Sequence, residues 1–298
     1  AELARAATAE GALIDLEKHC WPWSLMLVPV LQPRLYELAN NHIWRTQFGF
    51  RDWYADTAPA YMQLDMPAGL FSEWGWIDFG LQTYYALLNC GFRLQPTAGT
   101  AAGVHPVPLG FGRVYVQLEG PLEPHAWLEG LRRGRSFVTT GPMLLARCGG
   151  EPPGSTLQIE RGASVRISGE VYSSQQLERI EFVHNGRVQR FAPPANEPRQ
   201  PAGYVSRFEA DVTIERTSWL AVRAFEGREG GRWRFAHTAP FYLEVAGHPL
   251  RPRRMEVEYL VARIRQELRR NEGVLSAAAL AEYRQALAAY EKLLEEAE

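Results

Sequence analysis

Residues 11–50 read GALIDLEKHCWPWSLMLVPVLQPRLYELANNHIWRTQFGF and contain two short apolar runs, each accompanied by charged and polar side chains. The runs consist of Ala12, Leu13, Ile14 and Leu16, and then of Leu35, Tyr36 and Leu38. Short apolar runs of this kind are typical of strands buried on both faces, as in parallel sheets. The stretch therefore predicts two neighbouring strands of an α/β fold, with polar groups where each strand ends.

Three potential metal ligands accompany these strand ends. His19 follows the first run, Glu37 lies inside the second and His42 comes shortly after it. Ligands of parallel sheets and barrels bind at the carboxyl ends of the strands. Imidazole and carboxylate groups together suit zinc, manganese or iron. The pattern favours a divalent-metal site, and the alternative is that each histidine is an ordinary hydrogen-bonded residue of the core or its rim.

The composition is that of a globular protein. The chain has 298 residues, of which 46% are hydrophobic and 22% charged, and its net charge is -2. The basic residues are scattered along the sequence and indicate no large positive patch, so nucleic acid is not an expected partner. The three cysteines are far apart and form neither a disulfide framework nor a CxxC metal motif. No apolar window of about eighteen residues occurs, so we expect a soluble protein, cytoplasmic or extracytoplasmic after removal of a signal, without a membrane partner.

Residues 1–147 are expected to form an α/β domain. Ser72 and Gly91 bracket a pattern with helical spacing, as an N-cap and a C′ residue would. Three further elements are predicted in the order strand, helix, strand, over residues 113–118, 124–134 and 136–145. The last strand is interrupted by a Thr-Thr-Gly-Pro turn. This order is typical of α/β architecture.

The sequence pattern changes after residue 147 and again after residue 248. Residues 148–248 contain at least five alternating segments and no helical pattern, and Asn185-Gly186 is a strong hairpin signal, so a β-sandwich domain is expected. Residues 249–298 contain two amphipathic stripes, closed by Gly273 and opened by Ser276, which predict a C-terminal helical hairpin.

Several motifs resemble the CehA/McbA-type metallohydrolases of the PHP (polymerase and histidinol phosphatase) superfamily. They are GALIDLEKHCWPW, ELANNHIWRTQFGF, LNCGFRLQPTAGTAAGVHPVPLGFGRVYV, WLEGLRRGRSFVTTGPMLL and AHTAPFYLEV, in the order in which the family has them, over most of residues 10–245. The resemblance implies a distorted (β/α) barrel with bound divalent metals, often followed by a β-sandwich. It also implies hydrolysis of phosphate esters, carbamates or related esters.

The resemblance assigns metal ligands and reveals two departures. His19 resembles the family's histidine that ends a middle barrel strand and binds metal, and Glu37 and His42 resemble the acidic and polar positions at the end of the next strand. Residues 99–103, GTAAG, stand where the superfamily has an aspartate and a histidine, so either His105 replaces them or that metal position is lost. The opening HxH strand of the superfamily is absent. The chain is therefore expected to hold a partial PHP-type barrel, as a fragment or as part of a larger assembly, including a homo-oligomer.

The expected reaction is metal-assisted hydrolysis of a small-molecule ester or phosphoester. Lys18, Arg45 and Arg113 are the cations that would steady an anionic substrate group. Asp15 or Glu17 would orient an imidazole, and Thr139 with Thr140 would either touch the cleft or form a turn. The rival hypothesis is a non-catalytic binding protein in which the β-sandwich recognises a carbohydrate or a protein partner, with His237 at the rim of a strand.

Overall fold

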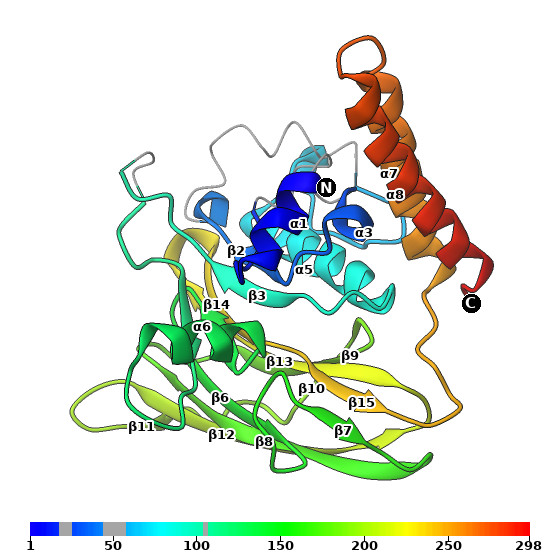
Figure 1. Ribbon diagram of the computed structural model, residues 1–298. Coiled ribbons are helices and arrows are strands. Elements are labelled where there is room, and N and C mark those ends of the chain that lie inside the picture. Colours follow the sequence, from blue (N-terminus) through cyan, green and yellow to red (C-terminus); the bar gives the residue numbers. More distant parts are fainter. Residues whose placement is uncertain (18–25, 44–57, 104–106) are drawn as a thin grey trace.

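The computed structural model describes residues 1–17, 26–43, 58–103 and 107–298 (Figure 1). It is a mixed α/β protein with a parallel sheet, antiparallel sheets and a C-terminal pair of helices. The described helices are α1 (Glu2–Ala9), α3 (Val28–Leu31), α5 (Glu73–Asn89), α6 (Pro124–Arg132), α7 (Arg254–Arg270) and α8 (Ala277–Glu295). Short 3-10 turns are η1 (Asn41–Ile43), η3 (Pro67–Gly69) and η4 (Glu229–Gly231).

The two strands expected from the opening stretch lie side by side and run parallel. They are β1 (Asp15–Leu16) and β2 (Leu35–Ala39), and β3 (Gln95–Ala98) pairs with the other edge of β2. One face of this sheet packs on α5, where the rings of Tyr36 and Tyr84 lie 5.0 Å apart. Strands β1, β2 and β3 form an open three-stranded parallel sheet, and the described strands form no closed barrel.

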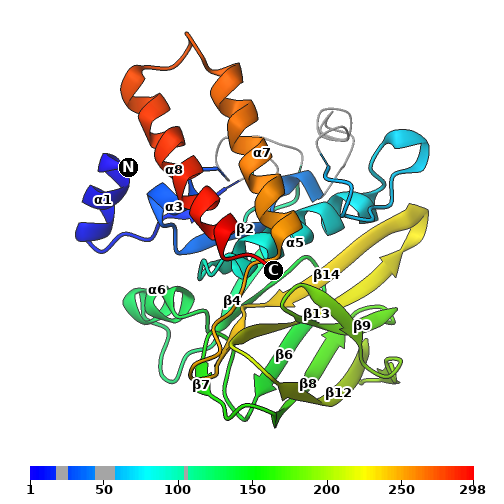
Figure 2. The ribbon, with the colours of Figure 1, turned by 90° about the vertical axis from the view of Figure 1, so that its right-hand side faces the viewer.

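Helix α5 forms where the helical spacing predicts it, and it lies at the centre of the molecule. Ser72 is the N-cap, and its hydroxyl oxygen accepts a hydrogen bond from the backbone N–H of Gly75. Gly91 follows the helix with a φ of 87°, a conformation that favours glycine. Nearly the whole circumference of α5 is buried, because the parallel sheet, the larger antiparallel sheet and α7 surround it (Figures 1 and 2).

Two antiparallel sheets face each other across a second hydrophobic core. The larger has the strand order β10-β9-β13-β14-β5-β4, with β15 and β7 attached, and the smaller has the order β11-β12-β8-β6. Their bounds are β4 (Arg113–Val116), β5 (Ser136–Thr139), β6 (Met143–Cys148), β7 (Thr156–Gln158), β8 (Ala163–Ser173), β9 (Arg179–His184), β10 (Arg187–Arg190), β11 (Glu197–Pro198), β12 (Tyr204–Ile214), β13 (Ser218–Arg228), β14 (Arg232–Thr238) and β15 (Phe241–Glu244).

The hairpin at Asn185-Gly186 is confirmed, because it joins β9 to β10 with φ values of 48° and 76°. The segment that we read as α/β architecture differs from the prediction. Strands β4 and β5 are antiparallel neighbours, and both belong to the larger antiparallel sheet. A strand-helix-strand order does not by itself fix strand direction. The domain boundary expected after residue 147 falls inside β6.

The C-terminal helices α7 and α8 lie side by side, as Figures 1 and 2 both show. Ser276 caps α8 by accepting a hydrogen bond from the N–H of Ala279, and Gly273 in the connection has a φ of 74°. The pair packs on the rest of the core through fully buried residues such as Leu260 and Tyr290. Among the described helices, none is long and apolar enough to cross a membrane.

Candidate functional site

The parallel sheet carries its polar side chains on the face that points away from α5. Residues two apart on a strand share a face, so Leu35 and Glu37 lie on one side of β2. Their register partners Asp15 and Thr97 lie on that side too. The hydroxyl group of Thr97 donates a hydrogen bond of 2.6 Å to Asp15 Oδ2. Two carboxylates and a hydroxyl group from all three strands therefore share one polar face.

The Glu37 carboxylate rests against a residue without a side chain. A Cβ atom at Gly99 would lie 2.2 Å from Glu37 Oε1, so glycine provides the space that this carboxylate occupies. The N–H of Gly99 donates a 3.0 Å hydrogen bond to the carbonyl oxygen of Ala39. Gly112 packs closely on the same backbone, since a Cβ atom there would lie 3.1 Å from the Gly99 oxygen. The ends of β2 and β3 thus meet the start of β4.

Asp15 titrates abnormally for an aspartate. Partial removal of its carboxyl group from water raises its pKa to about 6, although the residue as a whole is exposed. The hydrogen bond from Thr97 acts in the opposite direction, and the negative charge of Glu17 adds to the rise. A cation beside Asp15 would oppose this rise by favouring the charged carboxylate.

Three of the predicted site residues are described. Glu37 is half-buried on the polar face, and His42 is 3% exposed in η1, where its backbone N–H donates to Asn40 Oδ1 at 2.9 Å. Arg113 is exposed and directly follows Gly112 at the end of the parallel sheet. The structure thus brings Glu37 and the backbone of Arg113 to one end of the sheet and places His42 in the turn that follows β2.

The other four predicted residues, Lys18, His19, Arg45 and His105, lie outside the described residues. Within residues 1–17, 26–43, 58–103 and 107–298, no group of three or more His, Cys, Asp or Glu side chains has an arrangement that could hold a metal ion. Carboxylate oxygens and imidazole nitrogens are suitable donors for a divalent metal, and the space beside Gly99 admits the Glu37 carboxylate. The described donors fit the chemistry of a metal site but supply only part of one.

Sequence reasoning missed a cavity of about 460 Å³ between α5 and the larger antiparallel sheet. Asp78 and Tyr85 of α5 face Arg179, Glu181 and Arg223 of the sheet across it. Arg223 Nε donates to Glu181 Oε2 at 2.8 Å, and each of these side chains is 4% exposed. Arg223 also donates to the hydroxyl oxygen of Tyr85 at 3.3 Å. The pairing satisfies charges that would otherwise be costly to bury.

Arg179 lies among three aromatic rings at one side of this cavity. Its guanidinium carbon is 4.2 Å from the ring centre of Trp74, 4.5 Å from that of Phe225 and 4.8 Å from that of Trp233. Arg179 also forms an ion pair of 3.1 Å with Glu181. Burial lowers the pKa of Arg179, while Glu181 acts to raise it. The contacts come from α5, β9, β13 and β14 and fasten the helix to the sheet.

His237 is a buried structural residue rather than a rim residue. It lies near the end of β14 and is 0% exposed. Its Nδ1 lies 2.6 Å from the carbonyl oxygen of Thr238 and its Nε2 lies 2.9 Å from the hydroxyl group of Tyr85. Since the carbonyl only accepts, Nδ1 carries the proton and Nε2 accepts from Tyr85. Burial lowers the pKa of His237 to about 3, so the ring is neutral.

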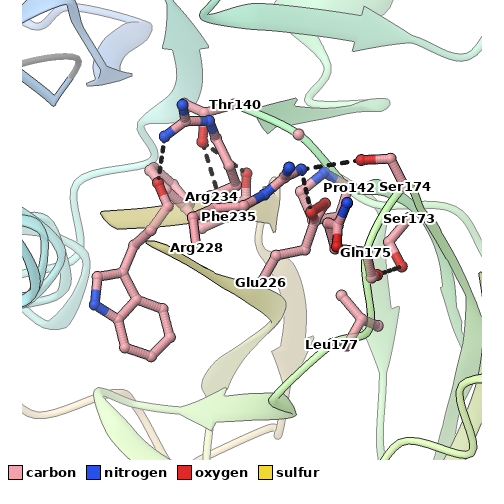
Figure 3. A network of polar contacts seen from close by, with 12 residues as sticks. Thr140, Pro142, Ser173, Ser174, Gln175, Leu177, Glu226, Arg228, Arg234 and Phe235 are labelled. Carbon is pink, nitrogen blue, oxygen red and sulfur yellow. Dashed lines mark hydrogen bonds and ion pairs between the residues drawn. The ribbon is translucent and has the colours of Figure 1, made fainter. Parts of the chain in front are cut away.

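A further polar network anchors the turn that contains Thr139 and Thr140. Thr139 Oγ1 accepts from the N–H of Gly141 and donates to the carbonyl oxygen of Pro142, which confirms that Thr139 is a turn residue. The N–H of Phe235 donates to Thr140 Oγ1 at 3.0 Å (Figure 3). These bonds tie the turn between β5 and β6 to β14.

Close to this turn, Figure 3 shows Arg228 bonded to Glu226 and to Ser174. The side chain of Glu226 is 0% exposed, and burial raises its pKa while Arg228 acts to lower it. We assign this pair a structural role, because both residues lie near the end of β13 in the larger sheet.

Comparison with models of known protein families finds no match for this chain. Comparison with curated protein sequences finds no relative either.

Proposed function

We propose that this protein is a metal-dependent hydrolase of phosphate esters, carbamates or related esters. The observation that carries the proposal is the polar face of the parallel sheet, where Asp15 and Glu37 extend from adjacent parallel strands beside Thr97. Ligand sites of parallel α/β sheets lie at the carboxyl ends of the strands. The proposal includes a partial PHP-type barrel built on β1, β2 and β3, followed by a β-sandwich that includes β4, β5 and β6.

Glu37 and His42, together with His19 and His105, are the residues that would hold the metal. A bound divalent metal supplies a water molecule of lowered pKa and polarises the oxygen of the scissile group. Asp15 and Glu17 would hold the ligand imidazoles in place by accepting their N–H protons. Arg113, with Lys18 and Arg45, would neutralise an anionic substrate group.

A hydrolysis assay with a matched pair of variants tests this function. The full chain, purified without chelator, should cleave para-nitrophenyl phosphate or para-nitrophenyl acetate, and a chelator should abolish the cleavage. Glu37→Gln should lower the metal affinity at least tenfold, roughly the effect of losing an oriented metal-site group. Glu10→Gln removes the same charge from an exposed residue of the N-terminal segment. It should leave the cleavage rates of para-nitrophenyl phosphate and para-nitrophenyl acetate unchanged. Chelator-resistant cleavage, or equal rates for Glu37→Gln and Glu10→Gln, would contradict the proposal.

A second candidate function, binding of a carbohydrate by the antiparallel sheets, is favoured by a specific cleft. A largely apolar cleft of about 550 Å³ opens between β4, β5, β6 and β8. The rings of Tyr115 and Phe137 stack in its wall at 5.2 Å with an angle of 12° between their planes. Tyr115 is 37% exposed, and an exposed ring of this kind provides a flat surface on which a sugar ring can stack.

Titration with a panel of oligosaccharides distinguishes the two functions. Under the binding hypothesis, one oligosaccharide binds saturably and Tyr115→Ala weakens its binding, while the chain contains no stoichiometric metal. Under the hydrolase hypothesis, Tyr115→Ala leaves the metal content and the cleavage rate unchanged.

A further inference from the structure

Five arginines converge on a small pocket at the amino ends of β2 and β3, opposite the edge that carries Gly99. The pocket has a volume of about 240 Å³. Gln95, Gly154, Ser155 and Tyr242 complete its lining, and the arginines are Arg34, Arg93, Arg132, Arg133 and Arg135. They come from the segment before β2, the segment before β3, and the end of α6 with the residues that follow it. Elements distant in the sequence thus bring five arginine residues to the lining of one pocket.

The carboxylates near these arginines compensate only part of their charge. Glu244 pairs with Arg93 at 2.5 Å, and Glu129 pairs with Arg132 at 2.7 Å and with Arg133 at 2.5 Å. Glu119 pairs with Arg135. Five guanidinium groups therefore meet three paired carboxylates, which leaves an excess of two positive charges.

Arg34 supplies one of the uncompensated charges. Its guanidinium group forms no ion pair or hydrogen bond with the described residues, and the residue is exposed. Burial raises the pKa of Tyr242, while Arg93 and Arg34 both act to lower it, so Arg34 is close enough to act on this phenol. An exposed cation next to other arginines is unfavourable unless an anion is present.

The backbone at the base of the pocket is closely packed around two glycines. A Cβ atom at Gly154 would lie 1.9 Å from the carbonyl oxygen of Arg133, and one at Gly134 would lie 2.2 Å from Gln95 Oε1. Both glycines have positive φ, of 81° and 74° respectively. The loop between β6 and β7 therefore fits tightly against the end of α6 and fixes the arginines relative to Gln95.

Gln95 and Tyr242 form a buried part of the pocket wall. Gln95 is 5% exposed, and its side chain acts together with Arg93 and Arg34 to lower the pKa of Tyr242. Its Oε1 is buried against Gly134. The charged residues that an anion would meet in this pocket are therefore the arginines.

We infer that this pocket is a binding site for a phosphate group. Arginine pairs with phosphate oxygens in a bidentate geometry, and the excess of two positive charges matches a phosphate dianion. The volume is below the range of about 300–1,000 Å³ that is typical of pockets for drug-sized ligands, which indicates a small ligand or one terminal group. The phosphate is either the free ion or the end of a small phosphate monoester. The site is separate from the proposed hydrolytic site and does not depend on it.

Titration calorimetry of the full chain with inorganic phosphate, sulfate and glycerol phosphate tests the inference. Phosphate should bind at one site with a Kd of about 1 mM or lower, and sulfate, a dianion of the same shape, should compete for that site. Arg34→Gln should weaken phosphate binding roughly tenfold, the effect of losing one charged hydrogen bond. Arg135→Gln should weaken it in the same direction. Tighter binding of glycerol phosphate would identify an organic phosphate as the source, and equal or weaker binding would identify the free ion.

Arg5→Gln is the matched control, because it removes an exposed arginine far from the pocket in sequence and leaves the pocket unchanged. It should bind phosphate as the parent chain does. Thermal melts of each variant without ligand check that the fold is retained. The inference is overturned if phosphate shows no saturable binding, or if folded Arg34→Gln and Arg135→Gln bind phosphate as tightly as Arg5→Gln.

Discussion

Thr97 donates a hydrogen bond of 2.6 Å to Asp15, although β2 lies between their strands. The bond connects the two outer strands of the parallel sheet over its polar face. It also acts on the titration of Asp15, whose pKa is raised to about 6 from an ordinary value of 3.8. The balance between removal from water and this hydrogen bond has a measurable effect on stability.

Asp15→Asn should stabilise the metal-free protein at neutral pH. The folded state binds the Asp15 proton more tightly than the unfolded state, so this residue reduces stability as pH rises from about 4 to about 6. Above pH 6 the substitution should add on the order of 1 kcal/mol, after allowance for solvent screening of a partly exposed group. Urea unfolding of both proteins at pH 4 and pH 7 measures the difference. An equal difference at the two pH values would show that Asp15 titrates normally.

His237 should have the opposite effect on the pH dependence. Its folded pKa of about 3 lies below the ordinary value of 6.5, so the unfolded state binds the proton more tightly and stability is lost as pH falls below about 6.5. His237→Gln preserves one donor and one acceptor for Thr238 and Tyr85 and should reduce this loss. Urea unfolding of the parent and of His237→Gln at pH 7.5 and at pH 5 measures this effect, through the difference between their midpoints at each pH. If that difference stays constant, His237 is not the buried neutral residue described above.

The buried pair of Arg223 and Glu181 should be strongly coupled. Removing one partner leaves a buried charge with weaker compensation, because Glu181 keeps Arg179 at 3.1 Å and Arg223 keeps Asp78 at 4.0 Å. Glu181→Leu and Arg223→Met should each lower the free energy of unfolding by about 3 kcal/mol, the low end of the range for a broken buried pair. The double variant should lose less than the two single variants together, by about 1–3 kcal/mol. Urea unfolding of all four proteins gives this coupling energy. Additive losses would mean that the two groups are stabilised independently.

Gly99→Ala should impair metal binding with little loss of stability. The new Cβ atom would collide with Glu37 Oε1 at 2.2 Å, and because this atom ends a flexible side chain, the carboxylate can move aside. The free energy of unfolding should change by less than about 1 kcal/mol, while the metal affinity falls at least about tenfold. Gly120→Ala is the control, because a Cβ atom at Gly120 would meet nothing within 4 Å. A Gly99→Ala protein with the parent's metal affinity would show that the position of this carboxylate is unimportant.

Local sequence signals predicted several elements correctly. The run that ends at Leu38 forms β2, Ser72 caps α5, and Asn185-Gly186 forms the expected hairpin. Of the run that ends at Leu16, only the last two positions form a strand, β1, which pairs with β2 in parallel. Each of these features is determined by residues close together in the chain, through side-chain periodicity, capping or turn geometry.

Features that depend on distant residues were not predictable. His237 is buried because it meets Tyr85, which is 152 residues away in the sequence. Strand β5 joins the antiparallel sheet because its partner β14 lies far downstream. The arginine pocket likewise combines Arg34 with Arg135 and Tyr242. For the candidate metal site, the sequence identified Glu37 but gave no sign that Gly99 provides its space, because that contact joins the ends of two strands.

Elemental analysis of the full chain, purified without chelator and dialysed against metal-free buffer, tests the central proposal most directly. The account predicts one or more zinc, manganese or iron ions per chain in the parent and in Glu10→Gln, and a clear loss of metal in Glu37→Gln. A folded parent chain without stoichiometric metal that also fails to take up added zinc, manganese or iron would contradict it.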